Sequence, residues 1–386
     1  MAYNHHPSYS DNPLWSDITP IPLDEGPGPG PALASIAYSP RYSTAMSYLR
    51  AVMASNEYSE RALSLTGDVI SMNPAHYTVW LYRAKIIREM GKEIHEELAW
   101  LEGVSRKSLK NYQIWHHRQT LMSSLPSPPA TEAEFLTKIL SLDSKNYHVW
   151  TYRQWLVSHF NLFDSPTELA AVETLLREDV RNNSAWNHRW FLCFGKDELE
   201  SGQRAKGGGG VVVVVDEDLV DREVAFAQDK ILLAPQNQSP WNYLRGLYRK
   251  AGRSLADLRS FAEQFAATQG GHDDDDDDDD DNDDEHEAAP VEREREREQE
   301  LDLEEGVRSS HALDLLADIY AAIGEREKAR KVLEVLGRRW DPVRKGYWDY
   351  KAGLLLDDED EDEEKKEEEE KGIKAVPEGG QGVAVA

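Results

Sequence analysis

The strongest constraint on the fold of this chain is a tryptophan that returns at an almost fixed interval. Trp80, Trp115, Trp150 and Trp186 are separated by 35, 35 and 36 residues, and Trp241 follows after a further 55. An arginine stands three residues after each of the first four tryptophans and four residues after the last. Repeats of this length are typical of antiparallel helix pairs that stack on one another. We therefore expect an all-α fold, an α-α superhelix built as a solenoid of helical hairpins.

The spacing inside one repeat predicts a helix, a short loop and a second helix. Amphipathic stretches such as Leu136, Ile139 and Leu140 precede the tryptophan and predict the first helix. An Asn side chain at the start of the second helix can cap it, and an asparagine lies four residues before four of the tryptophans: Asn111, Asn146, Asn182 and Asn237. The tryptophans are expected in the core, and the arginines are expected to bind loops or carboxylates between neighbouring pairs.

Composition divides the chain into five parts. Proline and glycine dominate the start, whereas long acidic runs cannot bury apolar surface and are expected to be disordered. The predicted parts are an irregular N-terminal arm at 1–40, helical repeats at 41–269 with a Gly/Val-rich insertion at 197–218, an acidic disordered insertion at 270–306, a C-terminal helical pair at 307–356 and an acidic disordered tail at 357–386. Within the pair, we expect helices from Leu313 to Ile323 and from Glu325 to Trp340, closed by Tyr347 and Trp348.

The two acidic segments hold almost all of the formal net charge of −28. Asp273 to Glu305 contains 21 acids and 3 arginines, or −18, and Asp357 to Lys371 contains 12 acids and 3 lysines, or −9. The remainder is nearly neutral, so we do not expect a nucleic-acid binder. No apolar run approaches the roughly 20 residues of a membrane span, and Cys193 alone allows neither an internal disulfide nor a cysteine-based zinc site. These features predict a cytoplasmic protein without a membrane span.

Equivalent loops of stacked repeats lie side by side, and we expect the binding edge there. Three tyrosines at the same position in successive repeats belong to this edge, together with three polar residues of the same loops: Tyr77, Tyr112, Tyr147, Lys110, Gln113 and His148. Taken alone, a loop lysine is usually only solvated. His116 and His117 point about 100° apart on a helix and do not form a metal pair, so the spacing by itself identifies no metal ligand and no catalytic group.

Several longer blocks carry a family resemblance. Asn73-Pro-Ala-His-Tyr-Thr-Val-Trp, Lys110-Asn-Tyr-Gln-Ile-Trp-His-His-Arg, Lys145-Asn-Tyr-His-Val-Trp and Asp179-Val-Arg-Asn-Asn-Ser-Ala-Trp are examples. They resemble the protein prenyltransferase α-subunit repeat, and most of all the α subunit shared by protein farnesyltransferase and type I geranylgeranyltransferase. The resemblance runs from about Leu14 to Gln269 and resumes from about Leu313 to Tyr350. The Gly/Val insertion, the aspartate run and the acidic tail depart from the family pattern.

The resemblance implies a crescent that wraps a separate β subunit and is inactive alone. The heterodimer would transfer farnesyl or geranylgeranyl from its diphosphate to the cysteine of a C-terminal CaaX sequence, in proteins such as small GTPases. Zinc would be bound by the β subunit, where it lowers the pKa of the substrate thiol, and magnesium would serve the assembled enzyme. This chain would bind neither ion.

The resemblance also implies roles for residues of the binding edge. Lys110 would be the catalytic lysine that reaches the isoprenoid diphosphate, whose leaving oxygens gain negative charge. Gln113 would contact the carboxylate of the CaaX peptide, and Tyr77 would lie beside the path of peptide and isoprenoid. Tyr147 and His148 would lie near the diphosphate end, with Tyr112 on the same ridge.

Three other interpretations remain open at this point. The α subunit of Rab geranylgeranyltransferase has the same repeat, although Lys145-Asn-Tyr-His fits the CaaX-type subunit better. A non-catalytic helical-repeat scaffold would have no need for both Lys110 and Gln113 in one loop. In an accessory role, the acidic tail would bind basic proteins, including the polybasic stretches that precede many CaaX sequences.

Overall fold

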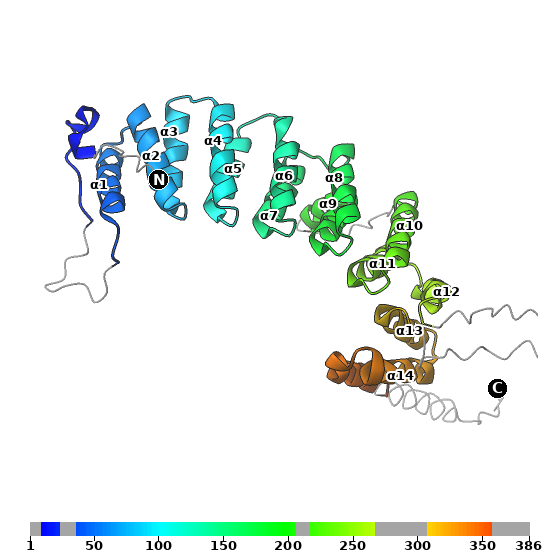
Figure 1. Ribbon diagram of the computed structural model, residues 1–386. Coiled ribbons are helices and arrows are strands. Elements are labelled where there is room, and N and C mark those ends of the chain that lie inside the picture. Colours follow the sequence, from blue (N-terminus) through cyan, green and yellow to red (C-terminus); the bar gives the residue numbers. More distant parts are fainter. Residues whose placement is uncertain (1–8, 24–35, 206–215, 267–306, 357–386) are drawn as a thin grey trace, which may run out of the picture. The chain divides into compact units, whose positions relative to one another are not determined.

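The computed structural model describes residues 9–23, 36–205, 216–266 and 307–356 of the chain (Figure 1). Within these ranges every regular element is a helix, which confirms the all-α prediction. None of the described helices is long and apolar enough to span a bilayer. The chain divides into two compact units, residues 1–211 and 212–386. The whole acidic insertion predicted at 270–306 and the whole tail predicted at 357–386 lie outside the described residues.

The first unit consists of α1 followed by four helical hairpins, as the repeat predicts. Its second helices, α3, α5, α7 and α9, contact one another in series and form one layer, while each packs on the first helix of its own hairpin. The elements are α1 (Pro40–Ala54), α2 (Glu60–Met72), α3 (Tyr77–Glu89), α4 (Ile94–Lys107), α5 (Tyr112–Met122), α6 (Thr131–Leu142), α7 (Tyr147–His159), α8 (Pro166–Glu178) and α9 (Asn183–Ala205).

The N-terminal arm packs against the start of this unit. Between residues 9 and 23 it makes two short 3-10 turns, η1 (Tyr9–Asp11) and η2 (Pro13–Trp15). Trp15 is buried, with its ring 5.5 Å from that of Tyr48 in α1. Arg61 of α2 donates to the carbonyl oxygen of Leu14 at 2.6 Å and pairs with Asp17 at 2.7 Å. The arm is therefore held by an aromatic contact and a charged one.

Each repeated tryptophan is fixed by its indole nitrogen as well as by burial. Nε1 of all five donates to the carbonyl oxygen six residues earlier, at 2.8 to 3.3 Å. The asparagines predicted as N-caps accept hydrogen bonds from the first turn of α5, α7, α9 and α11 (Gln238–Ala251), which confirms that prediction. Asn146 and Asn182 also donate to the carbonyls of Leu109 and Ser144 in the preceding repeat. The same two carbonyls accept from Trp115 and Trp150, so each joins two repeats.

Buried ion pairs connect one hairpin to the next at Arg83, Arg118 and Arg153, as predicted, whereas Arg189 pairs with Glu173 of its own hairpin. The partners of the first three are glutamates at the start of the following hairpin: Arg83 with Glu97 at 2.6 Å, Arg118 with Glu132 at 2.5 Å, and Arg153 with Glu168 at 2.8 Å. Each glutamate also contacts a residue of its own hairpin, namely His117 at 3.0 Å, Tyr152 at 2.9 Å and His188 at 3.4 Å. The carboxylate thus links two hairpins in the core.

The second unit begins with one regular hairpin. This hairpin is formed by α10 (Glu217–Leu233) and α11 (Gln238–Ala251). The other elements of the unit are η3 (Leu255–Leu258), α12 (Arg259–Glu263), α13 (Ser310–Ala322), α14 (Arg326–Val335), the π-helical turn η4 (Leu336–Trp340), η5 (Pro342–Arg344) and a helix over 345–356. The predicted last pair therefore corresponds to α13 and α14, which contact each other. The helix over 345–356 was not predicted; it buries Trp348.

The cap of α13 reveals a relation to the repeats that the sequence did not. Ser309 accepts a hydrogen bond from the backbone N–H of Ala312 and donates to the carbonyl of Pro235 at 2.6 Å. That carbonyl also accepts from Trp241. Ser309 thus does what Asn146 and Asn182 do, and α13 begins like the second helix of a repeat. Residues 267–306 separate it from α12, which hides this relation in the sequence.

The insertion predicted at 197–218 is shorter in the structure than in the sequence interpretation. Helix α9 continues through residue 205 and α10 begins at residue 217. Residues 197–205 contain no proline and one glycine, so nothing in them stops a helix. The glycine and valine runs at 207–215 lie outside the described residues.

Removing the charge of one buried glutamate should destabilise the first unit strongly. In Glu132→Gln the buried Arg118 loses its counter-charge, and we expect the free energy of unfolding to fall by about 3 kcal/mol. The matched control is Glu134→Gln on the same helix, which removes an exposed pair with Lys138 and should cost at most about 0.5 kcal/mol. Urea unfolding followed by tryptophan fluorescence measures both. Equal effects of the two substitutions would contradict the role given to Glu132.

Stability should fall as the pH drops below about 6.5. Burial lowers the pKa of both His117 and His188 below the ordinary value of 6.5. As the pH falls, these histidines therefore bind protons more readily in the unfolded chain than in the folded chain, so acid favours unfolding. We expect a loss of about 1 kcal/mol per histidine between pH 7.5 and 5.5. His188→Gln should make the free energy of unfolding depend less on pH. His95→Gln, on the exposed face of α4, should leave that dependence unchanged. Urea unfolding at several pH values tests this.

Candidate functional site

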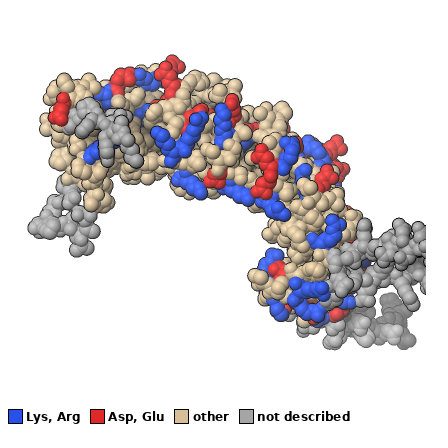
Figure 2. All heavy atoms as spheres, in the orientation of Figure 1, with Lys and Arg blue, Asp and Glu red and all other residues tan. Residues whose placement is uncertain are grey.

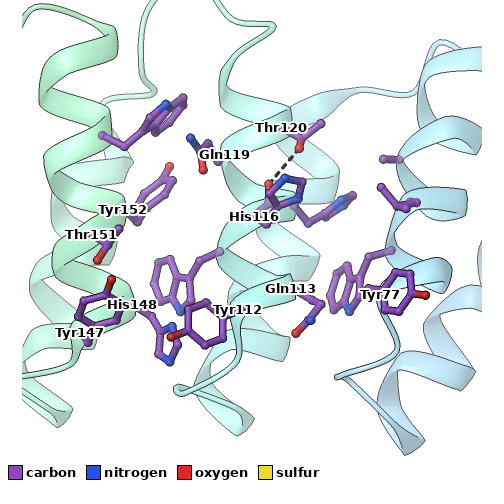
Figure 3. A pocket seen from close by; sticks show the side chains of 16 residues that line it. Tyr77, Tyr112, Gln113, His116, Gln119, Thr120, Tyr147, His148, Thr151 and Tyr152 are labelled. Atoms are coloured by element: carbon purple, nitrogen blue, oxygen red, sulfur yellow. Dashed lines mark hydrogen bonds between the residues drawn. The ribbon is translucent and has the colours of Figure 1, made fainter.

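An open groove of about 620 Å³ runs across α3, α5 and α7 (Figure 3). Five of the six residues predicted for the binding edge line it: Tyr77, Tyr112, Gln113, Tyr147 and His148. Its floor includes the buried repeat residues Trp80, Trp115 and Tyr152. The groove is thus built from the same side of three successive hairpins, and its lining is mostly aromatic.

The three tyrosines lie at equivalent places because each is the first residue of its helix. Tyr77, Tyr112 and Tyr147 begin α3, α5 and α7, and about two thirds of each side chain is exposed, at 66%, 65% and 65%. In Figure 3 they stand at the same end of the three helices. Large aromatic side chains left this exposed provide contact area for a ligand or a partner.

His148 is the most constrained polar residue of the groove. Its ring meets that of Tyr112 edge-on, with centroids 4.2 Å apart and planes at 87°. Its Nδ1 atom is buried and has no hydrogen-bond partner in the described structure. Burial lowers the pKa of His148, and the positive charge of Lys110 lowers it further. The lowered pKa favours the neutral form of the imidazole.

Lys110 lies beside the groove rather than in its lining. It belongs to the loop between α4 and α5, two residues before Tyr112, and 77% of its side chain is exposed. Its Nζ atom is 3.6 Å from Oδ2 of Asp143, which is longer than a hydrogen bond. Because Tyr112 meets the ring of His148, Lys110 lies near that end of the groove. Lys110 is thus a cation held loosely next to His148.

The loops at this end of the helices carry further positive charge. Lys145 lies in the loop between α6 and α7, 3.2 Å from Asp179, and Arg181 lies in the loop between α8 and α9. Figure 2 shows lysine and arginine side chains along the lower edge of the first unit, where α5 and α7 begin in Figure 1. An anion that approaches the groove from this edge meets favourable charge.

The sequence interpretation missed several residues of the groove. Leu81, His116 and Thr151 line it and stand four residues after Tyr77, Tyr112 and Tyr147. Residues four apart share a helix face, so this spacing was the signal that could have identified them. Thr120 and Trp155 extend the same face towards the other end of the groove.

The two adjacent histidines behave as the sequence predicted. His117 is buried against Glu97, whereas His116 points into the groove, so the two do not share a site. Over the residues that the structure describes, no group of three or more His, Cys, Asp or Glu side chains is arranged to hold a metal ion.

Known proteins share the repeated hairpins described above. The model of the protein prenyltransferase α-subunit repeat matches five segments of the chain, residues 59–90, 94–125, 129–160, 165–195 and 220–251. These segments coincide with the four hairpins of the first unit that follow α1 and with the hairpin α10–α11. The family model thus recognises the tryptophan repeat described above.

Curated relatives extend the match over most of the chain. The protein farnesyltransferase/geranylgeranyltransferase type-1 subunit alpha of Candida albicans is 33% identical over 88% of this chain and 97% of its own length. Its counterpart in Solanum lycopersicum is 40% identical over 90% of this chain and 91% of its own length. Among solved structures, a chain of Candida albicans protein geranylgeranyltransferase-I complexed with GGPP matches with a TM-score of 0.69 at 33% identity, covering 88% of this chain and 98% of that one. The repeats, the fold and these relatives agree: the chain belongs to the family of protein farnesyltransferase/geranylgeranyltransferase type-1 α subunits.

Proposed function

We propose that this chain forms a heterodimer with a prenyltransferase β subunit and thereby takes part in protein prenylation in the cytoplasm. The complex transfers farnesyl or geranylgeranyl from its diphosphate to the cysteine thiol of a C-terminal CaaX sequence, for example in small GTPases. The observation that carries the proposal is the groove across α3, α5 and α7, lined by five of the six predicted residues with Lys110 next to it. The membership of the chain in the α-subunit family supports it.

Lys110 is assigned to the departing diphosphate. As the bond between the isoprenoid carbon and its oxygen breaks, negative charge grows on the diphosphate, and a cation placed there stabilises the transition state more than the ground state. The side chain is exposed and is not hydrogen-bonded to Asp143, so it can reach a ligand at small cost. His148, whose lowered pKa favours the neutral imidazole, adds a polar ring to this end of the groove without an opposing charge. Tyr112 and Tyr147 complete this end of the groove.

The remaining residues are assigned to the peptide. Gln113 points into the groove one residue beyond Tyr112, and its amide can donate to the terminal carboxylate of the CaaX sequence. Tyr77 lies on the neighbouring helix, where its ring provides an apolar wall for the peptide and the isoprenoid. In this arrangement the α subunit binds and orients both substrates.

The metal ions belong to other parts of the assembly in this proposal. Zinc is bound by the β subunit and activates the substrate thiol, and magnesium is required by the assembled enzyme. The described residues of this chain hold no cluster suited to either ion. Its own contribution is therefore positive charge, hydrogen bonds and an aromatic surface.

Lys110→Ala should slow the chemical step by about 10 to 10³-fold, because one preorganised charge contact to the diphosphate is lost. Single-turnover farnesyl transfer by the heterodimer measures this directly. Lys138→Ala is the control, since Lys138 is an exposed lysine that pairs with Glu134 on α6 and does not line the groove. An unchanged single-turnover rate in the Lys110 variant would remove this residue from the mechanism.

The heterodimer itself is tested by co-expression. Farnesyl and geranylgeranyl transfer to a CaaX peptide are compared for this chain alone, for a farnesyltransferase or type I geranylgeranyltransferase β subunit alone, and for both together. We expect activity only in the co-expressed samples. A stable complex without activity would favour a non-catalytic scaffold. No complex at all would favour the α subunit of Rab geranylgeranyltransferase, to be tested with its own β subunit and an escort protein.

A further inference from the structure

Positive charge is concentrated in one part of the second unit. Residues 326–345 contain eight cations and three acids, a net charge of +5, and this stretch is called the basic face below. Its cations are Arg326, Lys328, Arg330, Lys331, Arg338, Arg339, Arg344 and Lys345. The other described residues of the unit contain nine cations and twelve acids, a net charge of −3. Figure 2 shows lysine and arginine side chains gathered over this part of the molecule.

The local ion pairs of the basic face are individually weak. Four of its cations pair with an acid three or four residues away: Lys328 with Glu325, Arg330 with Glu327, Arg344 with Asp341, and Lys345 with Asp349, at 2.5 to 3.0 Å. Such partly exposed pairs are typically worth at most about 1 kcal/mol each. The face therefore keeps a net positive charge and can exchange these partners for others.

A groove of about 630 Å³ lies within this region, between α14 and the helix over 345–356. Lys328, Arg330 and Lys331 line it from α14 together with Glu327 and Glu334, and Trp348, Asp349 and Leu356 line it from the helix. Leu356 is also the last described residue of the chain. The segment that follows it therefore starts at the groove.

That following segment has the complementary charge. Residues 357–371 contain 12 acids and 3 lysines, a net charge of −9, and no residue separates them from Leu356. A segment tethered this closely is present at an effective concentration of the order of millimolar, far above that of a partner in solution. Opposite charges of this size attract strongly at low ionic strength.

We propose that the acidic segment 357–371 binds the basic face of its own chain, across the groove between α14 and the helix over 345–356. The segment neutralises a surface that would otherwise attract polyanions. A polybasic protein must then displace the basic face before it can bind the segment. The tail therefore binds its own chain in preference to another molecule. The inference is independent of the proposed enzymatic function.

Zero-length cross-linking of the full chain tests this. A carbodiimide joins a lysine amine to a carboxylate only where the two already touch, and mass spectrometry identifies the linked peptides. We expect Lys328, Lys331 and Lys345 to be joined to acids of 357–370 within single molecules at about 0.01 M salt. At about 1 M salt, where the screening length falls from about 30 Å to about 3 Å, the yield should fall several-fold.

Two double variants that remove the same amount of positive charge distinguish binding at the basic face from non-specific attraction of the tail to the positively charged residues of the chain. Arg338→Gln with Arg339→Gln keeps every reactive lysine and should lower the yield at least about threefold. Arg249→Gln with Lys250→Gln removes the same charge from α11 and should leave the yield unchanged. Arg326→Gln with Arg330→Gln is a second test variant if the first has an altered thermal unfolding midpoint.

Three results would overturn the inference. One is a yield that neither salt nor the test variants change. Another is cross-linking of these lysines to the acidic residues of 273–305 instead. The third is complete capture of the tail of the unmodified chain by an equimolar polybasic peptide. The tail would then prefer a separate molecule to the basic face of its own chain.

Discussion

The buried pair between an arginine of one hairpin and a glutamate of the next is the interaction on which the first unit depends. Both charges have left water, so the loss of either partner is costly. On the arginine side the bonding is incomplete, because Nη1 of Arg118 and both Nη atoms of Arg153 are buried without a hydrogen-bond partner in the described structure. Here the glutamate meets an arginine from the preceding hairpin and a tyrosine or histidine from its own, as Glu132 meets Arg118 and Tyr152. A single carboxylate therefore sets the distance and the angle between two hairpins. A shift of either would leave a charge unpaired in the core.

The groove is a consequence of this register. Since each hairpin is fixed against the next, residues 35 positions apart arrive at equivalent places, and Tyr77, Tyr112 and Tyr147 line one surface. The shared carbonyls of Leu109 and Ser144 hold the helix starts together at the end where these tyrosines stand. Lys110 belongs to the same set of loops, so its charge lies beside the groove. The binding edge thus results from stacking, and no single short motif encodes it.

Much of this was accessible from the sequence, and the omissions have physical causes. The period of the tryptophans predicted the hairpins, and the asparagines predicted the helix starts. The glutamates stand 18 residues before Trp115, Trp150 and Trp186, yet their importance was missed because the matching arginine belongs to the preceding hairpin. Ser309 was missed for a similar reason, since residues 267–306 separate it from the rest of its repeat. Leu81, His116 and Thr151 followed from helical spacing but carried no chemical signal of their own.

The sequence by itself determined the repeated hairpins, their asparagine caps and the family, because these depend on contacts within a few residues and on a repeat that is visible in one dimension. Only the tertiary structure decided which distant side chains meet. It brought His148 against Tyr112, where burial and, to a smaller extent, the charge of Lys110 lower the pKa of the imidazole. It also placed Lys328, Arg330 and Lys331 in the lining of the same groove as Leu356, after which the acidic tail begins. Burial and charge act through distance in space, and that distance is set by packing rather than by position along the chain.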